Sequence, residues 1–293
     1  MMGRLLEKSI AVLSWIAGFL LIASLLLLLT YLVNKGWSSL RVSLIFGDTV
    51  PLDALLLKRQ VFDGIFPAIV GTLFLIVGSM FIAIPVGIAG GIYMAEYCRG
   101  KMKSLLNLAF DILAGVPSII VGLAGLLLTI FLNRTFHGQI KTCLLISCVS
   151  LASLVLPYII RTTQTALETV DPVVRKTAPA LGASRLQNIT MVLLPNSISN
   201  IFSGVILATG RCAEDTAVIM LTGAVATAGL PRSIFDQYEA LPFYIYYISS
   251  QYTGPDELAQ GFGAAIILLL LCTGLLVSTL WIQRRLSIIL LYR

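Results

Sequence analysis

Charged residues are scarce in this sequence, and histidine is nearly absent. Only 12% of the 293 residues are Asp, Glu, Lys or Arg, against roughly 25% in an average soluble domain. Because 58% of the residues are hydrophobic, the chain lacks the polar surface of a soluble domain, which indicates a membrane protein. His137 is the single histidine, and the five cysteines contain no CxxC pair. Neither a metal site nor a disulfide framework is therefore predicted, and the cysteines are interpreted as small core residues.

Apolar runs long enough to cross a bilayer as helices recur along the chain. The first run follows Arg4 and Lys8, as in a signal peptide. It is longer than the roughly 7 to 15 apolar residues of such a peptide, and no small-residue cleavage site follows it. We therefore predict one all-α domain over residues 1–293, a bundle of six transmembrane helices. The predicted spans are 10–33, 65–94, 108–131, 142–160, 196–222 and 262–282.

Lys and Arg are distributed unequally between the two sides of this bundle. Six spans place both termini on one side, and that side carries twelve Lys and Arg residues against seven on the other. Because positively charged loops stay in the cytoplasm, both termini are predicted to be cytoplasmic. We expect a multi-pass protein of the bacterial cytoplasmic (inner) membrane. The net charge of +6 belongs to these loops and does not indicate nucleic-acid binding.

The second and third spans contain small residues and proline. Five glycines in span 65–94 predict close packing against a neighbouring helix, since small side chains let helices approach each other in lipid. A hinge at Pro85 is the alternative interpretation. In the third span, Pro117 follows Gly115 by two residues, and this spacing predicts a bend.

The loop between the fourth and fifth spans, residues 161–195, has a helical pattern of its own. Asp171 before Pro172 is typical of a helix start, because the Asp side chain can cap the helix and proline suits its first position. Gly182 then interrupts the periodicity, so a helix, a turn and a second helix are predicted. Such a projecting helical pair is suited to a groove on another protein, although an ordinary connection is the alternative.

The same loop resembles the cytoplasmic signature of ABC importer permeases, in which Glu-Ala-Ala precedes a glycine and Ile-x-Leu-Pro follows. The matching stretch is "ALGASRLQNITMVLLP", with nine residues between Gly182 and Val192. Where the family has Glu-Ala-Ala, this chain has Lys176, Thr177 and Ala178. The resemblance implies coupling to an ATPase. The residues that it implicates are Lys176, Ala178, Leu181, Gly182, Ala183, Leu194 and Pro195.

Further segments are similar to phosphate-importer permeases of the PstA type, from about Gly71 to the C-terminus. These segments are "IPVGIAGGIYMAEYCRGK", "LAGVPSIIVGL", "LPYIIRTTQTALETV" and "LPFYIYYIS". The resemblance implies a bundle of the type I ABC importer class, in a heterodimer with a PstC-type permease. It also implies an ATPase dimer and an external phosphate-binding protein as partners. ATP and Mg would bind to the ATPase, with no catalytic residue or cofactor on this chain. The P-loop pattern is absent from the sequence, since Met102 follows Gly100-Lys101.

Three charged residues stand in the fifth span, in "GRCAEDTAVIM". A charge at the bilayer centre costs on the order of 2.5 to 3.5 kcal/mol, so we expect Arg211, Glu214 and Asp215 to face protein or water. On a continuous helix, Arg211 shares a face with both carboxylates. One interpretation is a buried Arg211–Asp215 pair that fixes the packing against a partner permease. The other is a translocation path in which Arg211 offers its planar fork to phosphate and the carboxylates hold the guanidinium.

Phosphate permeases of this type carry Arg followed by Gly-Glu-Thr-Ala-Pro at this place. Here Glu214 replaces the glycine, Asp215 the glutamate and Val218 the proline. The predicted pathway residues are Arg211, Glu214, Asp215 and Thr216. A permease for another oxyanion, such as phosphonate, sulfate or molybdate, is the first alternative, and a scaffold subunit is another. An intramembrane hydrolase, with Asp111 and Asp215 as a catalytic pair or Ser118 as nucleophile, is the remote one.

Overall fold

The computed structural model describes residues 2–47, 49, 51, 64–136 and 141–291, so His137 lies outside the described residues. In this part of the chain, six helices are long and apolar enough to cross a membrane, which confirms the predicted six-helix, all-α class. The elements up to residue 168 are α1 (Met2–Gly36), η1 (Trp37–Ser39), α2 (Val42–Phe46), α4 (Phe66–Ile92), η2 (Tyr93–Tyr97), α5 (Gly100–Ala114), α6 (Ser118–Thr135) and α7 (Leu144–Glu168). The remaining elements are α8 (Pro172–Ala180), α9 (Arg185–Asn188), η3 (Ile189–Leu193), α10 (Leu194–Glu214), α11 (Thr216–Thr222), α12 (Leu241–Gln251) and α13 (Pro255–Leu291).

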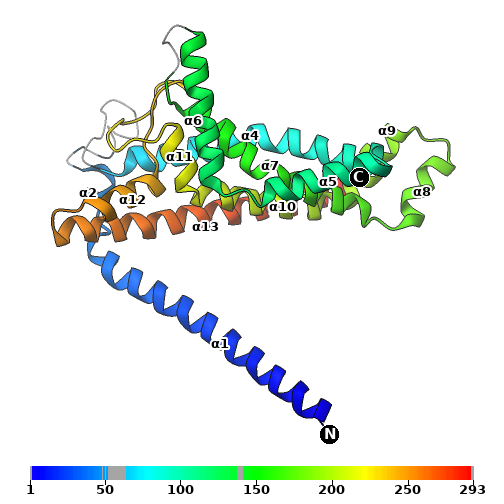
Figure 1. The fold of residues 1–293 in the computed structure, drawn as a ribbon, viewed down its shortest axis with the longest axis horizontal. Helices are drawn as coiled ribbons and strands as arrows, with labels where there is room; N and C mark the ends of the chain where they lie inside the picture. The colour runs from blue at the N-terminus through cyan, green and yellow to red at the C-terminus, as the bar shows by residue number, and fades with distance from the viewer. Residues whose placement is uncertain (1, 48, 50, 52–63, 137–140, 292–293) are drawn as a thin grey trace.

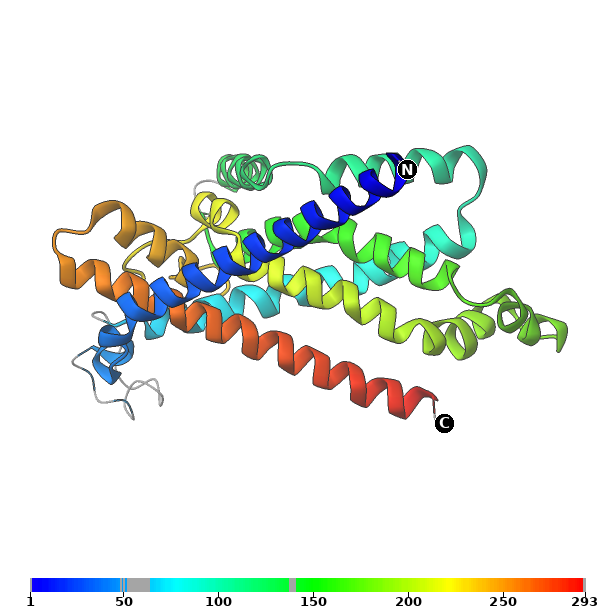
Figure 2. The ribbon, with the colours of Figure 1, turned by 90° about the horizontal axis from the view of Figure 1, so that it is seen from below.

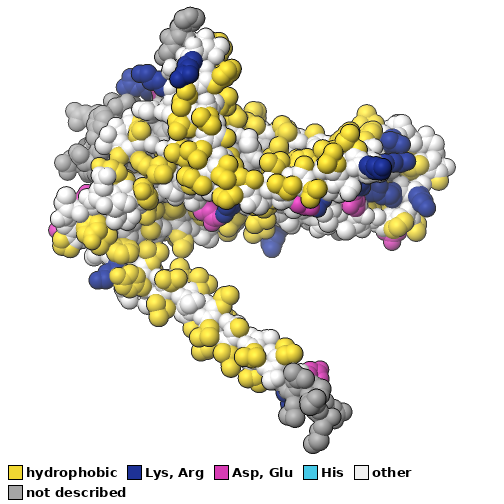
Figure 3. All heavy atoms as spheres, viewed as in Figure 1, with side chains coloured by type: hydrophobic (Ala, Val, Ile, Leu, Met, Phe, Trp, Pro, Cys, Tyr) yellow, Lys and Arg dark blue, Asp and Glu magenta, His cyan; other side chains and the backbone are white. Residues whose placement is uncertain are grey.

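Four long helices, α4, α7, α10 and α13, run beside one another and form the body of the molecule (Figure 1). Helices α8 and α9 project from one end, called the loop end below, and α2 and α12 lie at the opposite end. Helix α1 diverges from the body in Figure 1 and passes across it in the view from below (Figure 2). Its apolar side chains are exposed. Lys and Arg side chains gather at the loop end, whereas hydrophobic side chains cover the body (Figure 3).

The core of the body lies where α4, α7 and α10 meet. Leu75, Leu151, Val155 and Ala208 are buried there. Glycines of α4 allow this approach, because a methyl group at Gly87 would lie only 2.6 Å from Ile159 Cγ2 of α7. Helix α4 continues past Pro85 to Ile92 without a break. The structure therefore supports close packing as the role of these glycines.

The third predicted span, 108–131, is not one helix. Helix α5 ends at Ala114, and α6 begins at Ser118 and turns away from the direction of the body (Figure 1). Pro117 has an extended ψ of 134° and lacks the N–H that would continue the helix. The predicted bend at Gly115 and Pro117 is confirmed, whereas the prediction of a continuous span was wrong.

Helix α7 is longer than predicted and takes up the first part of the predicted loop 161–195. It ends at Glu168, beyond the predicted limit of 160. Polar residues in its last turns find partners on α5. Glu168 pairs with Lys103 at 2.7 Å, and Arg161 pairs with Asp111 at 2.9 Å. Polarity in this stretch therefore marks contacts between helices rather than a loop.

Candidate functional site

The fifth predicted span is interrupted at its charged residues. Helix α10 ends at Glu214 and α11 begins at Thr216, with Asp215 between them at φ −78° and ψ 102°. Asp215 Oδ1 accepts a hydrogen bond from the Val218 N–H at 2.9 Å and so caps α11. The carboxylate is buried, because the residue is 6% exposed. The expectation of one continuous helix over 196–222 was therefore wrong. The Asp215 side chain stabilises the break, because it accepts a hydrogen bond from a backbone N–H that the break leaves without a helical partner.

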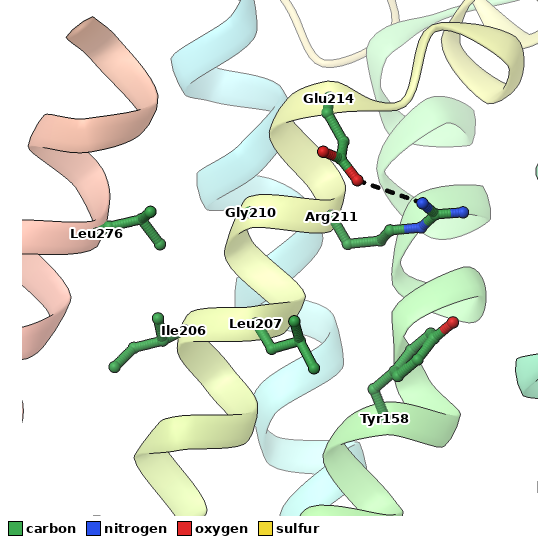
Figure 4. A pocket seen from close by; sticks show the side chains of 7 residues that line it. All are labelled: Tyr158, Ile206, Leu207, Gly210, Arg211, Glu214 and Leu276. Carbon is green, nitrogen blue, oxygen red and sulfur yellow. Dashed lines mark hydrogen bonds and ion pairs between the residues drawn. The ribbon is translucent and has the colours of Figure 1, made fainter. Parts of the chain in front are cut away.

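Arg211 pairs with Glu214. Its Nη1 lies 3.2 Å from Glu214 Oε1, and Figure 4 shows the carboxylate turned toward the guanidinium. The predicted pairing with Asp215 is corrected, because Asp215 is engaged as a cap. In the described part of the chain, the buried Arg211 Nε has no hydrogen-bond partner. The Nε–H is therefore an unsatisfied donor, which only a movement of the guanidinium would expose to a ligand.

Two hollows meet at this pair. The first, of about 520 Å³, is lined by Tyr158, Ile206, Leu207, Gly210, Arg211, Glu214 and Leu276 (Figure 4). The second, of about 360 Å³, is lined by Ser118, Arg211, Glu214, Asp215, Thr216 and Ala217. Only Arg211 and Glu214 belong to both linings, so this ion pair stands between the two hollows.

The structure brings all four predicted pathway residues to the second hollow. It adds Ser118, which the sequence suggested only as a remote nucleophile, and Tyr158, which the sequence did not suggest. Tyr158 donates its hydroxyl hydrogen to the Ala114 carbonyl at 3.1 Å, so its ring is held at the end of α5. The break at Pro117 places Ser118 at the start of α6. That break was visible in the sequence, but its position beside Arg211 was not.

The Arg211–Glu214 pair lies on an open face of this chain. The side chains are 42% and 64% exposed, respectively. At membrane depth, a charged pair is stable only against protein or water, because lipid cannot solvate it. This face of α10 therefore requires a covering surface or an aqueous path.

The carboxylates of the remote hydrolase alternative are engaged separately. Asp111 pairs with Arg161 at 2.9 Å, whereas Asp215 caps α11. Among the described residues, no group of three or more His, Cys, Asp or Glu side chains could hold a metal ion.

The loop end contains the helix–turn–helix that the sequence predicted. Asp171 accepts the Val173 N–H at 2.7 Å and caps α8, whose first residue is Pro172. Gly182 follows with φ +85°, a left-handed conformation that favours glycine. Ser184 and Gln187 then form a reciprocal capping box on α9. Local signals therefore define the two helices and the turn of this projection.

The residues implicated in coupling separate into a tip and a base. Leu181 is 84% exposed beside Gly182, and Lys176 is also exposed. Ala178 and Ala183 are half-buried beneath them. Leu194 and Pro195 form the first turn of α10, away from the tip. Further large apolar side chains are exposed on this projection, namely Val173, Leu186 and Met191.

Comparison with known proteins identifies the family. The model of the family described as "Binding-protein-dependent transport system inner membrane component" matches residues 87–288. The chain belongs to this family. It is a multi-pass membrane protein and a permease subunit of an ABC importer, a class whose members work with an ATPase and a binding protein.

Two curated relatives cover most of the chain. It is 29% identical over 264 residues to the probable ABC transporter permease protein YqgI of Bacillus subtilis, covering 85% of this chain and 86% of that protein. It is 31% identical over 243 residues to the phosphate transport system permease protein PstA of Haemophilus influenzae, covering 82% and 81%. Both relatives are transport permeases and not enzymes, and the resemblance to the PstA type is confirmed.

Solved structures with low sequence identity share the fold. A bacterial ABC transporter involved in the import of the acidic polysaccharide alginate matches with a TM-score of 0.61 at 16% identity, covering 91% of this chain and 96% of that chain. The MetNI methionine ABC transporter in an inward-facing conformation matches with a TM-score of 0.56 at 17% identity, covering 83% and 99%. At these identities the likeness concerns the fold alone.

Proposed function

We propose that this chain translocates inorganic phosphate as one permease subunit of an ATP-driven importer in the bacterial cytoplasmic membrane. The observation that carries the proposal is Arg211, whose side chain is partly exposed and whose guanidinium lies between the two hollows. A guanidinium offers a planar set of donors that matches the oxygens of a tetrahedral oxyanion. The phosphate named for the Haemophilus influenzae relative supports this cargo.

Glu214 weakens the binding of an anion to Arg211, and this favours release of the anion. The carboxylate, 3.2 Å from Arg211 Nη1, competes with an arriving anion for the same guanidinium. Transport needs such moderate binding, because an anion held too tightly would not leave. The hydroxyl groups of Ser118 and Thr216, which line the second hollow, can donate further hydrogen bonds to the anion.

A second permease subunit would complete the path. The exposed Arg211–Glu214 pair needs a protein surface or water opposite it at membrane depth. A partner of the PstC type, as the family resemblance implies, would cover this face and enclose the hollows. The translocation path would then run between the two permeases, with α10 on one wall. An external phosphate-binding protein would deliver the anion.

The loop end would receive the ATPase in the cytoplasm. Leu181 at the tip of the projection and Val173 on α8 present apolar surface to solvent at 84% and 75% exposure. Such side chains gain stability when they dock into a groove of a partner. Lys176, exposed between them, favours an acidic group on that groove. ATP and Mg would be bound by the ATPase dimer, whose closure would move α8.

Variants of Arg211 in the assembled complex test the pathway. Arg211→Ala should reduce phosphate uptake at least about tenfold, the scale of a lost charged hydrogen bond, without reducing the amount of purified complex. Arg211→Lys should retain part of the activity, because lysine keeps the positive charge but lacks the planar set of donors of the guanidinium. Arg134→Ala, which removes an exposed arginine at the end of α6, is the matched control. Normal uptake by well-assembled Arg211→Ala would contradict the proposal.

A further inference from the structure

The loop-end projection is fastened to the end of α4 by an ion pair. Arg175 Nη1 of α8 lies 2.6 Å from Glu96 Oε1 of η2, although the two residues are 79 positions apart in the sequence. The pair is largely removed from solvent, with Arg175 28% and Glu96 11% exposed. Low exposure strengthens the attraction, because little water screens the charges. The contact is therefore a firmer connection than an ion pair on an open surface.

Arg175 also binds the elements that flank α8. Its Nη2 donates to the Leu167 carbonyl near the end of α7 at 2.7 Å. Its own carbonyl accepts a hydrogen bond from Asn188 Nδ2 at the end of α9 at 3.2 Å. One arginine thus joins α7, α8, α9 and η2. A rigid unit at the base of the projection follows from this geometry.

A second contact attaches the same projection to the neighbouring residue of η2. The Arg185 guanidinium lies 5.4 Å from the ring centroid of Tyr97, within the range of a cation–π interaction. Beneath these polar contacts, Leu167, Ile189 and Leu193 form a small buried cluster against Ile92 of α4. Polar and apolar contacts therefore connect the projection with the same end of α4.

The shape of η2 explains how α4 reaches the projection. Residues Tyr93–Tyr97 form a π-helical turn, and Cys98 beyond it is extended. Wide turns of this kind re-aim side chains within a helix and often occur at functional positions. Helix α4 in turn packs along α7 through Gly87. A displacement of Glu96 would thus act on a helix of the core.

We infer that the Arg175–Glu96 pair is the link through which movement of α8 reaches α4. This inference rests on the proposed coupling of the projection to an ATPase. Adjacent residues of α8 then have different tasks. Lys176 is exposed toward the ATPase, whereas Arg175 is turned inward and transmits the displacement to the membrane helices. Arg175 and Glu96 are positioning residues, because neither lines the hollows at Arg211.

The test uses the whole complex, with the partner permease, the ATPase and the binding protein, reconstituted in vesicles. Phosphate taken up per ATP hydrolysed is measured for Arg175→Gln, Glu96→Gln and the exchanged pair Arg175→Glu with Glu96→Arg. Each single variant should lower this ratio by about fivefold or more while ATP hydrolysis continues. The exchanged pair should raise the ratio about threefold above either single variant, because the attraction is restored.

Lys103→Gln is the matched control, because it breaks another ion pair at the loop end, of 2.7 Å, that does not involve α8. It should leave the ratio unchanged. Single variants with a wild-type ratio would overturn the inference. An equal loss of complex and of activity without recovery in the exchanged pair would overturn it too, since that pattern indicates a folding role alone. A wild-type complex without ATP-dependent phosphate uptake would instead overturn the proposed function, and the inference with it.

Discussion

Arg211 pairs with Glu214, three residues along α10, while the neighbouring Asp215 turns to the backbone of α11. The two carboxylates are adjacent in sequence, yet one lies 3.2 Å from the guanidinium and the other accepts the Val218 N–H at 2.9 Å. Because the helix breaks between α10 and α11, the two carboxylates have different partners. Glu214, which replaces the glycine of the family pattern, therefore acts on Arg211, and Asp215 acts on the helix.

Removing the charge of Glu214 should tighten the binding of the anion. In Glu214→Gln, the guanidinium loses its exposed counter-charge, and an exposed pair of this kind is worth up to about 1 kcal/mol. We expect the concentration for half-maximal uptake to fall about two- to fivefold and the maximal rate to fall as well, because release slows. Initial uptake rates over a range of phosphate concentrations measure both quantities. A higher half-maximal concentration would show that Glu214 assists binding.

A β-branched residue at Gly182 should uncouple ATP hydrolysis from transport. Gly182 has φ +85°, which Val does not adopt without strain. A Cβ there would meet open space, so the effect comes from the backbone of the turn and not from a clash. Gly182→Asn is the matched control, because Asn tolerates the left-handed region. Unchanged uptake and substrate-stimulated ATP hydrolysis in Gly182→Val would argue against a coupling turn.

A methyl group at Gly87 should destabilise the bundle. The new Cβ would lie 2.6 Å from Ile159 Cγ2, so α4 and α7 would have to separate. Overpacking of this kind costs about 1–3 kcal/mol, and a lower thermal unfolding midpoint in detergent would report it. Gly274→Ala on α13 is the control, because its Cβ would meet no atom within 4 Å. Equal midpoints for the two variants would contradict the close packing of α4 on α7.

Glu239 should make the stability of the protein depend on pH. This residue is 6% exposed in the turn before α12, and burial raises the pKa of its carboxyl to about 7. The folded state therefore binds the proton more tightly than the unfolded state, whose pKa is near 4.5. The stabilisation is complete below about pH 4.5 and is lost as the pH rises through about 7.

Glu239→Gln removes this titration and is the variant that tests it. At about pH 5 the two proteins should have similar unfolding midpoints, because the wild-type carboxyl is protonated. At about pH 8 the variant should be more stable by up to about 2–3 kcal/mol, at roughly 1.4 kcal/mol for each pH unit. Both side chains can accept the Gly229 N–H, which bonds Glu239 Oε1 at 2.8 Å. A constant difference across this pH range would refute the buried ionisation.

Local signals in the sequence were sufficient for the loop-end projection. Asp171 and Pro172 define the start of α8 through short-range chemistry, and Gly182 supplies a turn that few other residues can adopt. The cap at Asp215 is equally local, but apolar residues follow it, and their periodicity concealed the end of α10. Hydrophobic periodicity identifies a span better than it identifies a break within one.

Contacts between distant segments could not be derived from the sequence. Arg161 and Glu168 were interpreted as loop residues because their partners, Asp111 and Lys103, lie on α5. The hollows at Arg211 also depend on tertiary packing, since Ser118 comes from α6 and joins residues around the α10–α11 break. A single sequence contains the charges of such a site without the geometry that brings them together.

Anion uptake by the complete complex in vesicles tests the central claim most directly. The complex contains this chain, a PstC-type permease, the ATPase and an external phosphate-binding protein. ATP is supplied on the side of the membrane that carries the ATPase. Uptake of phosphate is then compared with uptake of sulfate and molybdate. We predict ATP-dependent uptake of phosphate well above that of the other two anions, and its loss in Arg211→Ala. Equal or greater uptake of sulfate or molybdate, or phosphate uptake that is independent of ATP, would contradict the account.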